Sequence, residues 1–222
     1  KEFKYINKKL SKVKTLEIKN LIIKRENGTK ALDGLSLFLS KGQIYGLAGV
    51  SGNGQNELAE FLMGLHIPDQ GQILINDENL KKVSPQILRL QGIVSIPAER
   101  YVYGLAGELS VMENFSISQI DNRNYGHQLW INDQSIIKET KKIIHDYNIL
   151  GATPFTKARL LSGGNAQKLV LARELSINSK VLIAHSPTRG LDVRACNSIH
   201  ENLRKAADNG VAVLLISDDL DE

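Results

Sequence analysis

A glycine-rich loop between a buried strand and a helix constrains this chain more than any other feature of its sequence. The apolar run Ile44–Ala48 reads as a buried strand, and Gly-Val-Ser-Gly-Asn-Gly follows it at residues 49–54. An amphipathic helix comes next, with Leu58, Phe61 and Leu62 on one face. Glycines let such a loop curl so that several backbone N–H groups face one anion, and the helix N-terminus adds to the attraction. The arrangement predicts a phosphate-binding loop, with a plain strand-to-helix turn as the alternative.

Strands and helices alternate along most of the chain, which predicts an α/β fold. Short apolar runs without polar alternation, such as those at 93–96 and 181–184, read as strands buried on both faces of a mostly parallel sheet. Helices are expected between them, and an antiparallel stretch is expected at the front end, around the turn Asn27-Gly28. Residues from about 105 to 160 carry no strand pattern and are predicted to form an inserted helical subdomain.

Charge and cysteine content limit the binding partners and the redox compartment that are expected for the chain. The first 30 residues hold nine lysines and one arginine against three glutamates, although the formal charge of the whole chain is only +4. Such a basic arm can contact nucleic acid or a membrane surface, or it can be a solvated linker, which is the simpler interpretation. The single cysteine, Cys196, excludes an internal disulfide and reads as a packing residue in a reducing compartment. No apolar run approaches the roughly 20 residues of a membrane span.

Two further motifs point to a family. Leu161-Ser-Gly-Gly-Asn-Ala-Gln-Lys168 precedes an amphipathic helix, and Pro187-Thr-Arg-Gly-Leu-Asp192 follows a short buried strand. With the loop at 49–56, these segments resemble the ATP-binding cassette (ABC) family in order and spacing across about residues 15–222. The variants Gly-Asn-Gly-Gln, Ser-Gly-Gly-Asn and Pro-Thr-Arg-Gly-Leu-Asp are similar to those of ribose, galactose and nucleoside importers, which carry two cassettes in one polypeptide.

The resemblance implies how the chain is organised. It implies a mostly parallel sheet of the P-loop NTPase type, an antiparallel front sheet and a helical subdomain at about residues 105–160. Residues 1–14 are then expected to be the linker from a preceding cassette. Residues 15–222 are expected to be a second cassette whose C-terminal end is truncated. Residues 100–107 lie where the family touches its membrane subunit, with a flexible loop as the alternative.

The resemblance also assigns roles to positions, and this sequence departs from most of them. The Lys of the phosphate loop and the Mg²⁺-binding Ser or Thr are replaced by Gln55 and Asn56. The metal-side Asp falls at His185 and the water-activating Glu at Ser186. The switch His falls at Asp218. These five roles are the ones on which hydrolysis depends, so the chain's own site is expected to be degenerate and no catalytic residue is assigned.

These departures from the family pattern all weaken nucleotide binding or hydrolysis. Ala98 stands where cassettes place a Gln, and no adenine-stacking aromatic stands near Glu26. Loss of the Lys removes charge-assisted hydrogen bonds of about 1.5–3 kcal/mol each, and loss of the carboxylate lowers the rate about 10²–10⁴-fold. Imidazole is also a poor ligand for a hard cation, so Mg²⁺ is not expected here. Backbone N–H groups do not depend on side chains, which leaves weak ATP binding open for the loop residues Gly49, Ser51, Gly52, Asn53, Gly54, Gln55 and Asn56.

The signature segment, Ser162-Gly163-Gly164-Asn165, is intact. In the family two cassettes meet head to tail, and each ATP lies between one phosphate loop and the partner's signature segment. The resemblance therefore implies that this chain lends its signature segment to a composite ATP site on a partner cassette. Asp192 is similar to the Asp at the cassette interface. The alternative is that the signature segment serves only the start of its own helix.

The resulting hypothesis is a nucleotide-binding domain of a sugar or nucleoside importer, on the cytoplasmic side of the membrane and peripheral to it. It expects ATP, another cassette and permease subunits as direct partners, a solute-binding protein as an indirect partner, and Mg²⁺ at the composite site only. Little or no ATPase activity is expected of the isolated domain. The alternatives are a non-catalytic regulatory module and a non-transport ABC ATPase that acts on nucleic acid. Only the last predicts steeply salt-dependent binding to nucleic acid.

Overall fold

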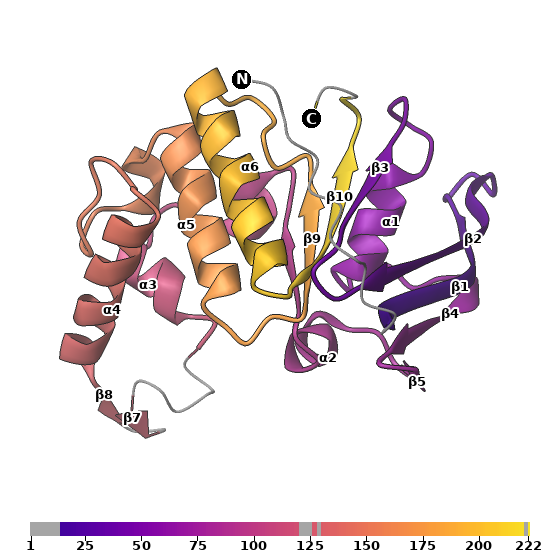
Figure 1. Ribbon diagram of the computed structural model, residues 1–222, viewed down its shortest axis with the longest axis horizontal. Coiled ribbons are helices and arrows are strands. Elements are labelled where there is room, and N and C mark those ends of the chain that lie inside the picture. Colours follow the sequence, from indigo (N-terminus) through magenta and orange to yellow (C-terminus); the bar gives the residue numbers. More distant parts are fainter. Residues whose placement is uncertain (1–13, 120–125, 128–129, 220–221) are drawn as a thin grey trace.

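The computed structural model describes residues 14–119, 126–127, 130–219 and 222. The predicted linker lies outside these residues except for Lys14, which begins the first strand, one residue before the expected boundary. The described residues form two main sheets, with helices on both faces of the parallel one (Figure 1). This is the α/β architecture, with a parallel and an antiparallel sheet, that the sequence predicts.

The parallel sheet lies at the centre and ends at the candidate site. Its strand order is β3-β10-β9-β6, formed by β3 (Ile44–Ala48), β10 (Ala212–Ser217), β9 (Val181–His185) and β6 (Ile93–Ile96). Every residue of β9 is buried, because helices cover one face of the sheet and the antiparallel sheet with α1 covers the other. Burial on both faces explains why these strands read as continuous apolar runs in the sequence.

The antiparallel sheet packs against the first helix. Its order is β2-β1-β4-β5, formed by β2 (Lys30–Ser40), β1 (Lys14–Lys24), β4 (Gln70–Ile75) and β5 (Glu78–Asn79). The turn between β1 and β2 closes where Asn27-Gly28 predicts it, with the Arg25 N–H donating to the carbonyl oxygen of Thr29 at 2.8 Å. Gly28 adopts a φ of 80°, which favours glycine.

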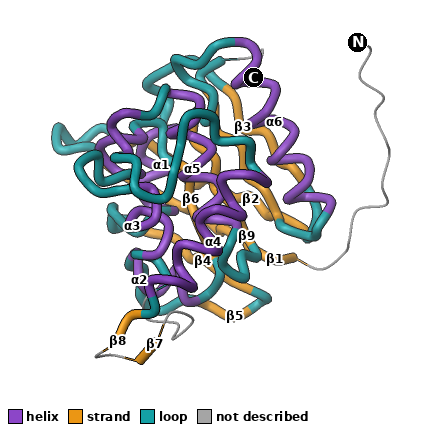
Figure 2. Tube along the Cα trace, turned by 90° about the vertical axis from the view of Figure 1, so that its left-hand side faces the viewer, coloured by secondary structure: helices purple, strands orange, loops and turns teal. Residues whose placement is uncertain are grey.

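Six α-helices and two shorter helical turns are present among the described residues. The α-helices are α1 (Gln55–Leu62), α2 (Pro85–Leu90), α3 (Val111–Ser116), α4 (Asp133–Asp146), α5 (Gly163–Leu175) and α6 (Val193–Asp208). The turns are the π-helical η1 (Arg100–Gly104) and the 3₁₀ turn η3 (Ala158–Leu160). α5 and α6 lie side by side on one face of the parallel sheet, and α1 lies on the other (Figures 1 and 2).

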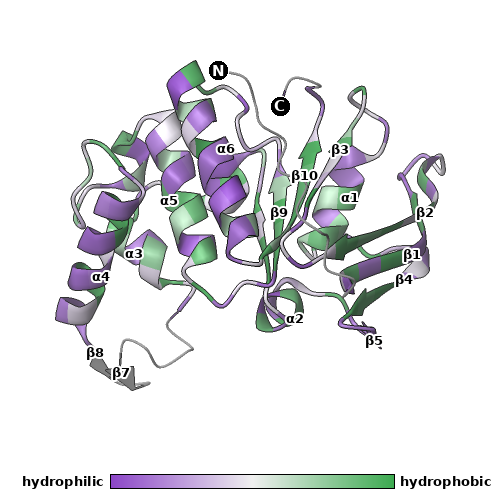
Figure 3. Ribbon diagram, viewed as in Figure 1, coloured by the Kyte–Doolittle hydropathy of each residue, from purple (hydrophilic) through white to green (hydrophobic). Residues whose placement is uncertain are grey.

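Apolar side chains separate into two cores. One lies between the parallel sheet and the helices α3 to α6, and the other lies between the parallel sheet, α1 and the antiparallel sheet. The central strands are hydrophobic, whereas the outward faces of α4 and α6 are hydrophilic (Figure 3). No described helix has the length and apolar character that crossing a bilayer requires.

The predicted helical subdomain is only partly helical. α3, α4 and η3 fall within residues 105–160, but β7 (Gly126–His127) and β8 (Trp130–Ile131) pair as a small antiparallel hairpin there. Strands of two residues are too short to show an alternating pattern, so the sequence did not reveal them. The segment that is expected to be mostly helical therefore also contains a short hairpin.

Candidate functional site

The glycine-rich loop connects β3 to α1 at the carboxyl end of the parallel sheet. The Gly49 N–H donates to the carbonyl oxygen of Ser217 on β10 at 3.3 Å, which ties the loop to the sheet. Gly52 and Gly54 have φ values of 92° and 99°, where side chains are strained. A Cβ added to Gly54 would also collide with the carbonyl group of Ala31. The structure thus has the strand, glycine-rich loop and helix that the sequence predicts, and phosphate binding by the loop stays a prediction.

Gln55 fills the interior of this loop with its own side chain. Only 4 % of the residue is exposed. Its Nε2 donates to the carbonyl oxygen of Val50 at 3.0 Å, and lies 3.0 Å from where a Cβ on Gly49 would be. Its Oε1 is buried without a hydrogen-bond partner in the described structure. A buried acceptor oxygen repels a phosphate, so the loop does not fit a phosphate group unless Gln55 moves.

Arg25 forms hydrogen bonds with the same loop and with the helix that follows it. Its Nε donates to Oε1 of Glu57 at 2.6 Å, and its Nη2 donates to the carbonyl oxygen of Gly52 at 2.7 Å. Arg25 precedes Glu26, where the family resemblance leads one to expect an aromatic side chain. Sequence reasoning missed this contact because Arg25 and Glu57 are 32 positions apart.

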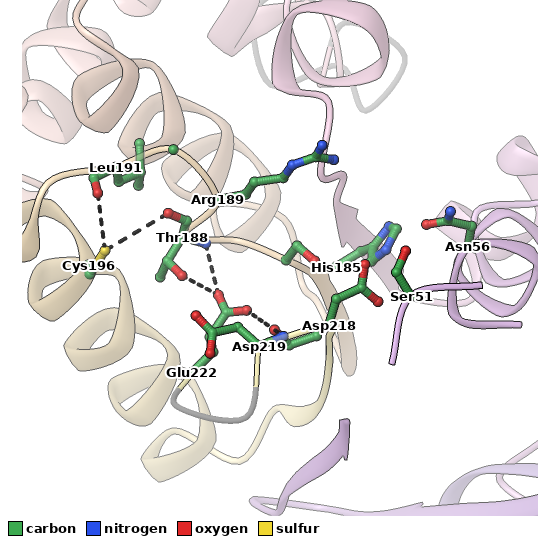
Figure 4. Close-up of a pocket in the computed structure, with 13 residues that line it drawn as sticks. Ser51, Asn56, His185, Thr188, Arg189, Leu191, Cys196, Asp218, Asp219 and Glu222 are labelled. Carbon is green, nitrogen blue, oxygen red and sulfur yellow. Dashed lines mark hydrogen bonds between the residues drawn. The ribbon is translucent and has the colours of Figure 1, made fainter. Parts of the chain in front are cut away.

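A pocket of about 630 Å³ opens between the loop and the ends of β9 and β10. It brings together five of the residues singled out in the sequence, Ser51, Asn56, His185, Ser186 and Asp218. Figure 4 shows the His185 ring facing Ser51 and Asn56, with Asp218 beside them. Residues of the signature segment do not line this pocket. Four of the five substituted positions, Asn56, His185, Ser186 and Asp218, therefore lie at one pocket, whereas Gln55 and the signature segment do not line it.

His185 stands where the family resemblance expects a metal-binding carboxylate. Burial lowers the pKa of its imidazole below the ordinary value, although Asp218 and Glu222 act in the opposite direction. The ring is therefore neutral at pH 7. No group of three or more His, Cys, Asp or Glu side chains in the described part of the chain could hold a metal ion. A neutral imidazole stands where the family resemblance expects a carboxylate, and the carboxylates elsewhere on the pocket wall do not form a group that fits Mg²⁺.

Glu222 is a pocket residue that sequence reasoning missed. The Thr188 N–H donates to its carboxylate at 2.9 Å, and the hydroxyl groups of Thr188 and Ser217 donate to it as well (Figure 4). With Asp218 and Asp219 it places three carboxylates on the wall of the pocket. All three would repel the phosphates of a nucleotide. The acidic run at 218–222 was the available signal.

The signature segment begins α5 and leaves its first turn open. Ser162 occupies the N-cap position but makes no capping hydrogen bond. Its Oγ accepts from Nδ2 of Asn165 at 2.9 Å, and Oδ1 of Asn165 accepts from the Leu150 N–H at 3.0 Å. The exposed Ser162 hydroxyl is thus oriented by Asn165 and keeps its own hydrogen for an external acceptor. With the uncapped N–H groups of α5, it can bind an anion.

The two glycines of the signature segment have different surroundings. A Cβ on Gly164 would lie 2.7 Å from Cβ of Ala195 on α6, so this glycine lets the two helices approach. A Cβ on Gly163 would meet only the ends of flexible side chains, Nη2 of Arg100 at 3.1 Å and Cδ2 of Leu191 at 3.3 Å. Packing accounts for Gly164 but not for Gly163. α5 begins at Gly163, so both glycines lie in its first turn.

Asp192 has a structural role within the chain. Its side chain caps α6 by accepting from the N–H groups of Arg194 at 2.9 Å and Ala195 at 3.0 Å. The residue is exposed. Its role at a cassette interface stays a prediction.

Comparison with known proteins agrees with this geometry. The family described as ABC transporter matches residues 32–189. The nucleoside import ATP-binding protein NupA of Lactococcus lactis is 37 % identical over 93 % of this chain and 41 % of the relative. The guanosine import protein NupO of Bacillus subtilis is 36 % identical over 93 % and 41 %. The ribose import protein RbsA of Bacillus cereus is 32 % identical over 93 % and 42 %.

Solved structures share the fold. The dimeric cassette MJ0796 bound to ADP and phosphate has a TM-score of 0.78 at 21 % identity, over 93 % of this chain and 89 % of that one. A nucleotide-free cassette has a TM-score of 0.77 at 23 % identity, over 94 % and 83 %. This chain spans about two fifths of the length of the curated relatives described above. It belongs to the ABC transporter family, as an ATP-binding domain homologous to the ATPases of sugar and nucleoside importers.

Proposed function

We propose that this chain is the second, degenerate cassette of an importer for sugars or nucleosides, and that it completes an ATP site on a partner cassette. The names of the relatives support the class of solute and the import role. In this proposal the domain works at the cytoplasmic face of the membrane with permease subunits and another cassette. Its own site contributes little or no hydrolysis.

One observation supports the proposal: the pocket beside the phosphate loop and the start of α5 differ in how well they suit a phosphate. The pocket beside the phosphate loop contains a neutral His185 and the carboxylates of Asp218 and Glu222, and Gln55 fills the loop. The start of α5 presents the opposite chemistry, with an exposed Ser162 hydroxyl and open N–H groups. A domain built this way is suited to bind a phosphate that another chain holds.

The experiment is ATP hydrolysis and solute uptake by the assembled transporter carrying Ser162→Arg. We expect the substitution to abolish both, because a long cationic side chain would occupy the space of the phosphate and remove the hydroxyl. Ser36→Arg is the matched control, since Ser36 is exposed on β2 and outside the pocket and the signature segment. We expect it to leave both rates unchanged.

Two results would contradict the proposal. Wild-type uptake and hydrolysis by the Ser162→Arg transporter would exclude a contribution of the signature segment and favour a regulatory module. Turnover of about 1 s⁻¹ or more by the isolated chain, in the range of ordinary enzymes, would show that its own site is competent.

The η1 turn supports a contact with a permease subunit at residues 100–107. Tyr101, Val102 and Tyr103 are 45 %, 69 % and 57 % exposed, although all three are large apolar or aromatic side chains. Contiguous exposed apolar residues of this kind mark interaction surfaces.

A further inference from the structure

Two loops of the molecule are joined by side chains from a third segment. The signature segment lies at the start of α5, and the loop formed by residues 187–192 lies before α6. The third segment, at residues 99–101, leads into η1 after β6. Tyr101 donates its hydroxyl hydrogen to the carbonyl oxygen of Leu161 at 3.2 Å. Glu99 accepts from Nη1 of Arg189 at 3.1 Å.

Arg100 lies between the two loops. Its Nη1 and Nη2 both donate to the carbonyl oxygen of Arg189, at 3.2 and 3.3 Å. The same Nη2 lies 3.1 Å from where a Cβ on Gly163 would be, and 3.8 Å from that position on Gly190. The guanidinium group therefore spans the gap between the signature segment and the loop at 187–192.

The position of Arg100 is set by hydrogen-bond geometry and not by an ion pair. Among the described residues no carboxylate forms a salt bridge with it, because Glu99 pairs with Arg189 instead. A cation beside the N-terminus of a helix is electrostatically unfavourable. Arg100 stays there because its forked, planar group reaches one carbonyl with two nitrogens, which an ammonium group cannot reproduce. The π-helical turn that begins at Arg100 is a feature found frequently at functional sites.

We propose that Arg100 is a positioning residue that holds the signature segment at a fixed distance from the loop at 187–192. It thereby places the Ser162 hydroxyl for the nucleotide of the partner cassette. This inference rests on the proposed function, because it requires that the signature segment act on a nucleotide. Arg100 acts through Gly163 and Arg189, and no contact with the nucleotide is assigned to it.

The test is steady-state ATP hydrolysis by the assembled transporter with Arg100→Gln and Arg100→Lys. We expect kcat to fall about tenfold or more in both variants, since a displacement of about 1 Å can lower a rate up to about 100-fold. KM for ATP should change little, because the partner's phosphate loop holds most of the nucleotide. Arg159→Gln is the matched control, since this neighbouring arginine is 53 % exposed in its side chain and pairs with Glu108. It should leave kcat unchanged.

The outcomes separate this inference from the proposed function. An unchanged kcat in both variants, or full activity of Arg100→Lys, overturns the positioning role. If Ser162→Arg abolishes hydrolysis while the Arg100 variants are active, only this inference fails. If Ser162→Arg is also active, the proposed function fails. Thermal unfolding of each variant is measured in parallel, so that a fall in kcat is compared only at temperatures where the variant is folded.

Discussion

Replacement of Gly164 with alanine measures how much of the signature segment serves packing. The added Cβ would lie 2.7 Å from Cβ and 3.9 Å from Cα of Ala195. Carbon atoms pack at about 3.5–4.0 Å, so the starts of α5 and α6 must separate by roughly 1 Å. Overpacking of this kind costs about 1–3 kcal/mol, and the better helix propensity of alanine offsets about 1 kcal/mol of it. The expected loss in the free energy of unfolding is about 0–2 kcal/mol.

Thermal unfolding of the chain is the assay. A domain of this size changes its Tm by about 2–4 °C per kcal/mol, so Gly164→Ala should lower it by up to several degrees. The decisive comparison is the double variant Gly164→Ala/Ala195→Gly, which moves the methyl group from α6 to α5. It should recover stability relative to the two single variants, because residues in contact show coupling that distant residues lack.

Gly163→Ala is the matched comparison in the same segment. Its Cβ would meet only the ends of Arg100 and Leu191, which can shift, so the Tm should change less than in Gly164→Ala. The reasoning would be refuted if Gly164→Ala were no more destabilising than Gly163→Ala, or if it were equally destabilising with and without Ala195→Gly. Either result would show that the contact with α6 does not explain this glycine.

Two other residues give sharp expectations. Gln55→Ala removes the carboxamide that fills the phosphate loop. Millimolar ATP or inorganic phosphate should therefore raise the Tm of this variant and leave the Tm of the wild type unchanged. An equal shift in both proteins would show that Gln55 does not block the loop. The lowered pKa of His185 means that the unfolded chain binds a proton that the folded chain does not, so stability is lost as the pH falls below about 6.5. His185→Gln should reduce this loss between about pH 6.5 and 5 in denaturant titrations, with part remaining because burial also lowers the pKa of His200. A slope that is the same in wild type and variant would contradict the assignment.

Local patterns in the sequence were enough to predict most of the fold. The glycine-rich loop was recognisable because its turn needs backbone conformations that glycine favours, as Gly52 and Gly54 confirm. The strands of the parallel sheet were recognisable because burial on both faces makes them uniformly apolar, as in Val181–His185. Both signals come from neighbours in sequence, which is why they were visible without a structure.

Individual side-chain contacts were not predictable in this way. The family resemblance places Gln55 where a lysine is expected, but it does not show that the side chain turns inward to Val50. Arg100 and the carbonyl group that it contacts, on Arg189, are 89 positions apart. Such pairs depend on how β6, α5 and β9 are brought together, and no periodic pattern records that. From the sequence, the signature segment was interpreted as a single motif. In the structure, its two glycines differ in how closely they pack.

The open first turn of α5 affects how the domain can associate and separate. A side chain of Ser, Asn or Asp accepts a hydrogen bond from an N–H group in the first turn of α2, α3, α4 and α6, whereas α1 and α5 have no such bond. In the isolated domain, water can accept hydrogen bonds from the open N–H groups of α5. The absence of a partner therefore does not reduce the stability of the fold at this helix end. An incoming anion exchanges with that solvent while the backbone stays where it is. Under the proposed function, the partner's nucleotide could therefore be bound and released without a rearrangement of this backbone.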